Sequence, residues 1–143
     1  MKPEEWTLLA INAAKEQGLS PVRLQKALFL LGRHLPSDLG ESFYSFTPYN
    51  YGPFDSEIYE DARKLAAKGF ININQSPGQR WVEYQITASG IQVASQLNQA
   101  APQQVVEYLN TVVSWTLSLS FQQLVGAIYK MYPEFKVNSV FNS

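Results

Sequence analysis

The sequence predicts a mainly α domain of the α+β class: a winged helix-turn-helix-like core with one β-hairpin, plus two C-terminal helices. Three observations carry this prediction. Apolar residues recur every three or four positions in three segments before Gly69, which is the spacing of amphipathic helices. Residues 71–86 instead alternate apolar and polar side chains around a Ser-Pro-Gly turn, as a hairpin does. Helical spacing returns after Thr87, and the order helix, helix, helix, hairpin, helix is that of a winged helix-turn-helix.

The first two helices are marked by proline at their starts. Pro3 suits the first turn of a helix that ends by Gly18, because a proline there gives up no helical hydrogen bond. Ser20 as N-cap and Pro21 as first helical residue open a second helix, which Pro36 ends. The apolar stripe of this second helix is wide, so we expect it to be buried on most sides.

The stretch between residues 36 and 53 is predicted to be a loop that packs onto the domain. It is rich in proline, glycine and serine, yet it also holds five aromatic rings. A short strand is expected at residues 43–47. A third helix is expected from Phe54 to Lys68, with Gly69 as its stop.

The C-terminal half is predicted to be helical apart from the hairpin. Thr87 is expected to cap a fourth helix, and the polar run at residues 98–101 is expected to be a hinge before a fifth. A capping box that begins at Ser120 opens a sixth helix. Residues 1–99 are therefore predicted to form the winged-helix-like core, and residues 100–143 a helical extension within the same globular domain.

The two C-terminal helices carry many apolar and few charged side chains. Either they form a homodimer contact, because this is more apolar surface than one helix pair readily hides, or they complete the core of the monomer. The side chains expected to be exposed for a homodimer are those of Val113, Trp115, Leu117, Phe121 and Tyr129.

The composition favours a cytoplasmic protein with no membrane partner. The N-terminus carries acidic residues where a signal peptide would be basic. No apolar stretch approaches the ~20 residues of a membrane span. The absence of cysteine fits a reducing compartment.

We expect a non-enzymatic protein with no catalytic residue, no cofactor and no metal. The single histidine, His34, falls near the predicted end of the second helix, where it complements the helix dipole. Glu57 and Asp61 lie four positions apart, but acids near a helix N-terminus also have that electrostatic role. No phosphate-binding glycine motif, metal signature or nucleophile elbow is present.

DNA binding as a winged-helix transcriptional regulator is the alternative function. The presumptive recognition helix carries four acids against three bases, with the acids in its first turns, and the net charge of the chain is −1. Contact with DNA phosphates requires more basic than acidic residues on this helix, so DNA is the less favoured partner. The residues that would make such contacts are Arg23, Lys26, Arg63, Lys64, Lys68 and Arg80.

Two segments resemble the Panacea or SocA-like antitoxin domain family, which has phage-associated relatives. Residues 24–30, Leu-Gln-Lys-Ala-Leu-Phe-Leu, are similar to its Leu-Gln-Lys helix, and residues 46–54, which contain Tyr-Gly-Pro, are similar to its aromatic signature. The resemblance covers residues 20–97. It implies a winged-helix-like antitoxin or regulatory domain that acts through protein–protein contacts, with a toxin as the candidate partner.

The signature also has a physical interpretation. Gly52 permits a positive φ or a close backbone approach, and Pro53 suits the first turn of the third helix. Tyrosine rings can pack inward and leave their hydroxyls for a partner. The predicted partner-binding residues are Tyr49, Tyr51, Gly52, Pro53 and Tyr59.

Overall fold

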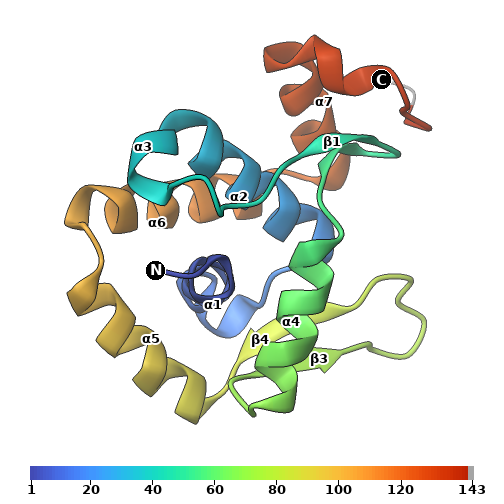
Figure 1. Ribbon diagram of the computed structural model, residues 1–143. Helices are drawn as coiled ribbons and strands as arrows, with labels where there is room; N and C mark the ends of the chain where they lie inside the picture. The colour runs from blue at the N-terminus through green and yellow to red at the C-terminus, as the bar shows by residue number, and fades with distance from the viewer. Residues whose placement is uncertain (142–143) are drawn as a thin grey trace.

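Seven α-helices and two short antiparallel hairpins make up residues 1–141, the part of the chain that this computed structural model describes (Figure 1). The class is therefore mainly α, α+β, as predicted. The helices are α1 (Pro3–Ala13), α2 (Pro21–His34), α3 (Pro36–Leu39), α4 (Glu57–Ala67), α5 (Ala88–Ala100), α6 (Gln103–Ser118) and α7 (Phe121–Met131). The strands are β1 (Thr47–Tyr49), β2 (Gly52–Phe54), β3 (Ile71–Asn74) and β4 (Glu83–Ile86), and two 3₁₀ turns are η1 (Lys15–Gln17) and η2 (Pro133–Lys136).

The predicted helix caps are confirmed. The Ser20 hydroxyl accepts a hydrogen bond from the backbone N–H of Arg23, 3.3 Å away. The Thr87 hydroxyl accepts from Gly90 N–H at 3.0 Å, and Ser120 forms a capping box with Gln123. Each side chain satisfies an N–H that the first turn of a helix leaves without a partner.

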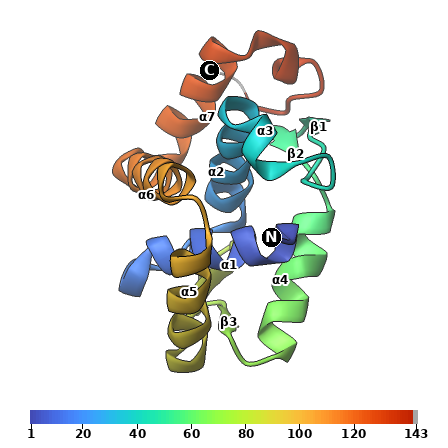
Figure 2. The ribbon, with the colours of Figure 1, turned by 60° about the vertical axis from the view of Figure 1, so that its left-hand side comes forward.

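Helix α1 lies at the centre of the fold. Figures 1 and 2 show α4 and α5 on opposite sides of it, with α2 above. Its buried run from Trp6 to Ile11 contacts α2, α4, α5, α6 and strand β4. The strands β3 and β4 pair antiparallel, with Ile71 opposite Ile86, and form the predicted hairpin. The order helix, helix, helix, hairpin, helix is confirmed for α1, α2, α4, β3–β4 and α5.

The prediction of a single hairpin is wrong, because β1 and β2 form a second one. Thr47 lies opposite Phe54, and Pro48 opposite Pro53. Proline has no N–H, so a proline pair fits a ladder position that carries no hydrogen bonds between the two residues. The strand expected at residues 43–47 is thus displaced to Thr47–Tyr49. Pro53 belongs to β2 rather than to a first helical turn.

Two helix boundaries also differ from prediction. Helix α4 begins at Glu57 rather than Phe54, because Phe54 is in β2. The hinge expected at residues 98–101 is wrong, since α5 continues to Ala100 and the chain turns at Ala101 and Pro102. Polar side chains at residues 98 and 99 reflect an exposed helix face and not a break.

The C-terminal helices complete the core of the monomer. Helix α6 packs along α2 and also contacts α1, with Val105, Leu109 and Val113 buried. Of the five side chains expected to be exposed, Val113 and Tyr129 are buried, and the other three are half-buried. That expectation of exposed apolar surface is wrong, and the argument for a homodimer through these helices loses most of its basis. Among residues 1–141, no helix has the length and apolar character needed to cross a membrane.

The aromatic loop before β1 is held by a buried hydrogen-bond network. The Tyr44 hydroxyl donates to Asp61 Oδ2 at 2.5 Å and lies 2.7 Å from the Thr7 hydroxyl, with which it is hydrogen-bonded. Burial and the bond to Asp61 raise the pKa of Tyr44. This network links the loop to α1 and α4, so the predicted packing of the loop is confirmed.

Replacing Tyr44 with phenylalanine should lower the free energy of unfolding by about 1–2 kcal/mol, because buried Thr7 and Asp61 each lose a partner. Urea unfolding of the purified protein measures the change. Tyr108→Phe is the matched control, because the Tyr108 hydroxyl makes no hydrogen bond with any described residue, and its effect should stay within about 0.5 kcal/mol. Equal effects of the two substitutions would contradict a stabilising role of the network.

Candidate functional site

The two segments that carry the family resemblance contact each other directly. Gln25 of α2 donates from Nε2 to the Asp55 carbonyl at 2.9 Å and accepts at Oε1 from the Asp55 N–H at 3.0 Å. Lys26 Nζ donates to the Tyr51 carbonyl at 2.5 Å. Both side chains are buried. These three hydrogen bonds fasten the β1–β2 hairpin to α2, since buried polar groups and the backbone satisfy one another.

All five predicted partner-binding residues line one pocket of about 320 Å³. We call it the aromatic pocket. Its wall consists of the hairpin, α2, α4 and the loop between β3 and β4. Beside the predicted Tyr49, Tyr51, Gly52, Pro53 and Tyr59, the lining residues are Val22, Gln25, Lys26, Asn50, Phe54, Arg80 and Trp81.

The rings around the aromatic pocket hold one another in place. Tyr49 stacks on Phe54 with ring centroids 4.6 Å apart, and Tyr59 meets the same ring edge-on at 5.4 Å. Tyr51 meets Trp81 edge-on at 6.1 Å. Such pairs fix ring orientation beyond the effect of burial alone. Tyr49 and Trp81 nevertheless remain about half exposed, at 50% and 45%.

The tyrosine hydroxyls of the pocket are available to a partner. Those of Tyr49, Tyr51 and Tyr59 make no hydrogen bond to any other residue of the described range. Burial raises the pKa of Tyr59, so this hydroxyl is protonated and can donate at neutral pH. The prediction that the rings pack while the hydroxyls stay available agrees with this geometry.

Gly52 has the positive φ that the sequence predicted, at +111°. A Cβ at this position would lie 3.4 Å from the Tyr129 ring and 3.6 Å from Lys26 Nζ. These are ordinary van der Waals distances, so the positive φ, and not a lack of space, favours glycine at this position.

Lys26 has an unusual environment for a lysine. It is 1% exposed, and its pKa is lowered to about 7 because burial disfavours the charged amine. Lys26 is therefore not part of an exposed basic surface. Long charged side chains are rarely buried without a partner, and here the partner is a backbone carbonyl.

Arg23 is also unsuited to phosphate contact. Its Nε donates to the Thr116 carbonyl at 3.0 Å and its Nη2 to the Leu119 carbonyl at 2.6 Å. These carbonyls lie at the C-terminal end of α6, where helix carbonyls lack intrahelical partners and a cation is favoured. Arg23 thus joins α2 to α6, and its Nε and Nη2 donate within the fold.

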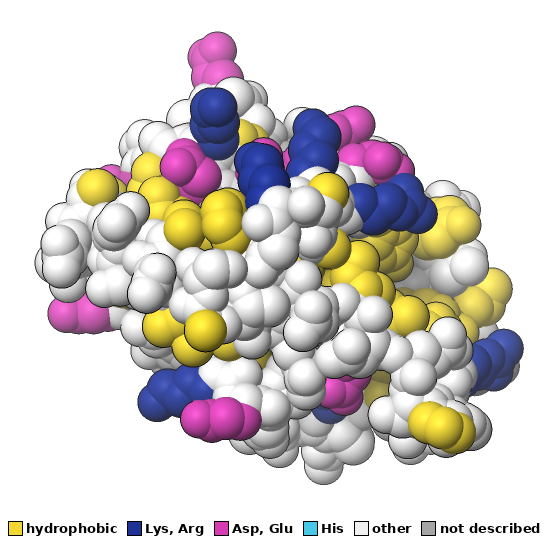
Figure 3. Space-filling view, turned by 90° about the horizontal axis from the view of Figure 1, so that it is seen from below, with side chains coloured by type: hydrophobic (Ala, Val, Ile, Leu, Met, Phe, Trp, Pro, Cys, Tyr) yellow, Lys and Arg dark blue, Asp and Glu magenta, His cyan; other side chains and the backbone are white. Residues whose placement is uncertain are grey.

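The bases of α4 are exposed but each lies beside an acid. Arg63 pairs with Glu60, Lys64 lies 3.8 Å from Asp61, and Lys68 Nζ lies 2.7 Å from Glu4 Oε1. Figure 3 shows this lower side of the molecule, where basic and acidic side chains adjoin along one edge and much of the surface is uncharged. Arg80 is in the loop between β3 and β4 and lies 5.7 Å from the Trp81 ring. The six predicted DNA-contact residues therefore do not form one basic face.

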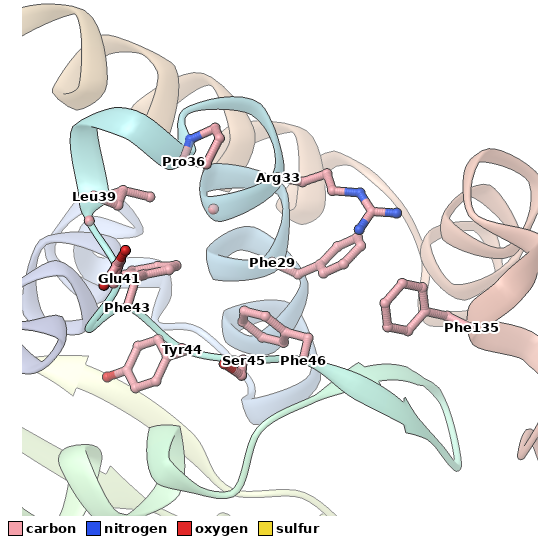
Figure 4. A pocket seen from close by; sticks show the side chains of 12 residues that line it. Phe29, Arg33, Pro36, Leu39, Glu41, Phe43, Tyr44, Ser45, Phe46 and Phe135 are labelled. Atoms are coloured by element: carbon pink, nitrogen blue, oxygen red, sulfur yellow. The ribbon is translucent and has the colours of Figure 1, made fainter.

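A second pocket, of about 260 Å³, lies between α2, the aromatic loop and η2. Figure 4 shows Arg33 extended over Phe29, with Phe46 and Phe135 nearby. The guanidinium lies 5.6 Å from the Phe29 ring and pairs with Glu134 at 2.9 Å. Because this charge already has an acidic partner, the pocket offers less to an incoming group than the aromatic pocket does.

The residues considered for catalysis have other roles in the structure. Asp61 accepts a hydrogen bond from the Tyr44 hydroxyl, and Glu57 lines the same depression of the surface. His34 lies at the end of α2, as predicted, with Nε2 3.1 Å from the Tyr132 hydroxyl. Within residues 1–141, no group of three His, Asp or Glu side chains could hold a metal ion.

Sequence reasoning missed five lining residues of the aromatic pocket: Val22, Gln25, Asn50, Phe54 and Trp81. Gln25 carried a usable signal, because it is a polar residue inside a helix whose wide apolar stripe predicted burial. Trp81 carried none, since only the tertiary structure brings the β3–β4 loop to the hairpin.

The sequence matches no protein-family model, and no curated protein matches it significantly.

Proposed function

We propose that the protein is a non-enzymatic binding protein, antitoxin-like or regulatory, that holds a protein partner at the aromatic pocket. The observation that carries this proposal is the convergence of Tyr49, Tyr51 and Tyr59 on one pocket with unused hydroxyls. Exposed, pre-oriented aromatic rings beside a concave surface are typical of residues that dominate binding energy at protein interfaces. Rings already fixed by neighbours also lose little conformational freedom on binding.

The partner is expected to depend on Tyr49. The tagged protein, expressed in its own cells, should recover a specific partner, and Tyr49→Ala should weaken the complex by about 1–2 kcal/mol, or roughly 5–30-fold in Kd. Ile91→Ala is the matched control, because Ile91 is 51% exposed on α5 and lies outside the pocket. Isothermal titration with the purified partner measures the two affinities.

A triple variant separates protein binding from DNA binding. Combined replacement of Arg63, Lys64 and Lys68 by alanine should leave the partner complex intact. A gel-shift titration with random duplex at low salt should show no strong shift, because the bases of α4 are paired with acids. Tight, salt-sensitive retardation that the triple substitution abolishes would overturn the proposal in favour of a DNA-binding regulator.

A further inference from the structure

The aromatic pocket contains basic groups and no acidic ones. Lys26 and Arg80 line it, and no aspartate or glutamate does. Two acidic residues directly follow lining residues in sequence. Asp55 turns its carboxylate to the backbone N–H groups of Ser45 and Glu57, each at 2.9 Å, and Glu60 pairs with Arg63. Asp55 and Glu57 line a different depression of the surface, next to Lys64. The pocket therefore has an electrostatic preference of its own.

Lys26 lacks a counter-charge. A protonated amine has three N–H donors, and among the described residues only the Tyr51 carbonyl accepts from it. Burial without an acid lowers the pKa of this amine to about 7. A carboxylate brought into the pocket would supply both the missing acceptor and the missing charge, and charge-assisted hydrogen bonds are the strong ones.

Gly52 and Lys26 lie side by side in the wall of the pocket. Lys26 is buried, and a Cβ at Gly52 would lie 3.6 Å from its Nζ, an ordinary van der Waals distance. The Tyr49, Phe54 and Tyr59 rings form the apolar part of the wall around it. The volume is at the lower end of the ~300–1,000 Å³ typical of ligand pockets, so it fits one or two side chains rather than a whole helix.

We infer that the aromatic pocket binds an acidic side chain of the protein partner, with the apolar side chain next to it in the partner's sequence. The carboxylate lies between Lys26 and Arg80, and the apolar side chain packs against the tyrosine and phenylalanine rings. This inference rests on the proposed function and adds to it the chemistry of the segment that is recognised.

Two capped tripeptides test the inference on the full-length protein. ¹⁵N-labelled protein is titrated with acetyl-Leu-Glu-Leu-amide and, in parallel, with acetyl-Leu-Gln-Leu-amide. The glutamate peptide should shift the Gly52 amide and the Trp81 indole N–H, and the glutamine peptide should bind at least about 10-fold more weakly. Lys26→Met should reduce this difference to less than about 3-fold. Arg80→Gln should also reduce the difference in affinity between the two peptides, and it should not affect folding because Arg80 is in a loop between strands. This variant replaces Lys26→Met in the test if Lys26→Met does not fold.

Each contrary result has a definite meaning. Equal binding of the two peptides, or no binding at millimolar concentration, would overturn the acidic preference. Shifts confined to Arg63 and Lys64 on α4 would overturn the site. If 3-phenylpropionate binds at the pocket and the glutamate peptide does not, the ligand is a small carboxylate, and the inference of a protein segment is wrong. A partner whose binding requires Tyr49 would still support the proposed function in all these cases.

Discussion

Replacing Lys26 with methionine should remove a pH dependence of stability that the natural chain shows above neutral pH. The pKa of Lys26 is about 7 in the folded protein and 10.5 in an unperturbed lysine. Between these values the unfolded chain binds a proton that the folded chain does not, so the stability of the natural protein rises with pH. This gain in the free energy of unfolding is complete above pH 10.5 and is lost as the pH falls to about 7.

The expected size is large enough to measure by urea unfolding. From about pH 7 to about pH 9, the difference in unfolding free energy between the natural protein and Lys26→Met should change by about 2 kcal/mol in favour of the natural protein. Comparing the two proteins at each pH cancels other titrating groups. Lys130→Met is the control, because Lys130 is exposed on α7, and its difference should not change with pH. A constant difference for Lys26→Met would show that the buried amine keeps its charge.

Gly90→Ala should lower the free energy of unfolding by about 3 kcal/mol or more. A Cβ at this position would lie 2.0 Å from the Phe70 carbonyl oxygen and 2.8 Å from Ile86 Cδ1. The same carbonyl accepts a hydrogen bond from Thr87 N–H at 3.1 Å, so the backbone around it cannot shift without breaking that bond. Thermal unfolding followed by circular dichroism measures the loss.

Gly126→Ala is the matched control for Gly90→Ala. Gly126 is also helical, in α7, but a Cβ there would meet nothing within 4 Å. Since alanine is the better helix former, Gly126→Ala should raise stability by up to about 1 kcal/mol. If both substitutions changed the free energy of unfolding in the same direction, close packing of β4 and α5 against Phe70 could not be the reason for glycine at position 90.

The caps and helices were predictable from sequence because their signals are local. Ser20, Thr87 and Ser120 each satisfy an N–H within three residues, and the apolar spacing identifies the buried faces without knowledge of the partner element. The β1–β2 hairpin was not predictable in this way. Proline usually argues against a strand because it has no N–H to donate to a neighbouring strand. This hairpin tolerates two prolines because its register places Pro48 opposite Pro53.

The site was predictable in part for the same reason. Tyr49, Tyr51 and Gly52 are close in sequence, so a short motif identifies them together. The contact of Lys26 could not be predicted because its acceptor is a carbonyl 25 positions away, and those of Arg23 could not because its acceptors lie more than 90 positions away. Sequence spacing contains no information on such pairs.

The hairpin that forms the aromatic pocket is secured by residues far later in the chain. The Asn50 carbonyl accepts from Val140 N–H at 3.0 Å and from the Ser139 hydroxyl at 3.3 Å, and Asn138 donates to the Pro48 carbonyl at 3.4 Å. Contacts of such long sequence separation carry a loop-closure cost and form late in folding. During synthesis, a ribosome that has released only α1 to α6 presents the hairpin sequence without these contacts. We therefore expect the hairpin to reach its final position only after residues 138–140 have left the ribosomal exit tunnel.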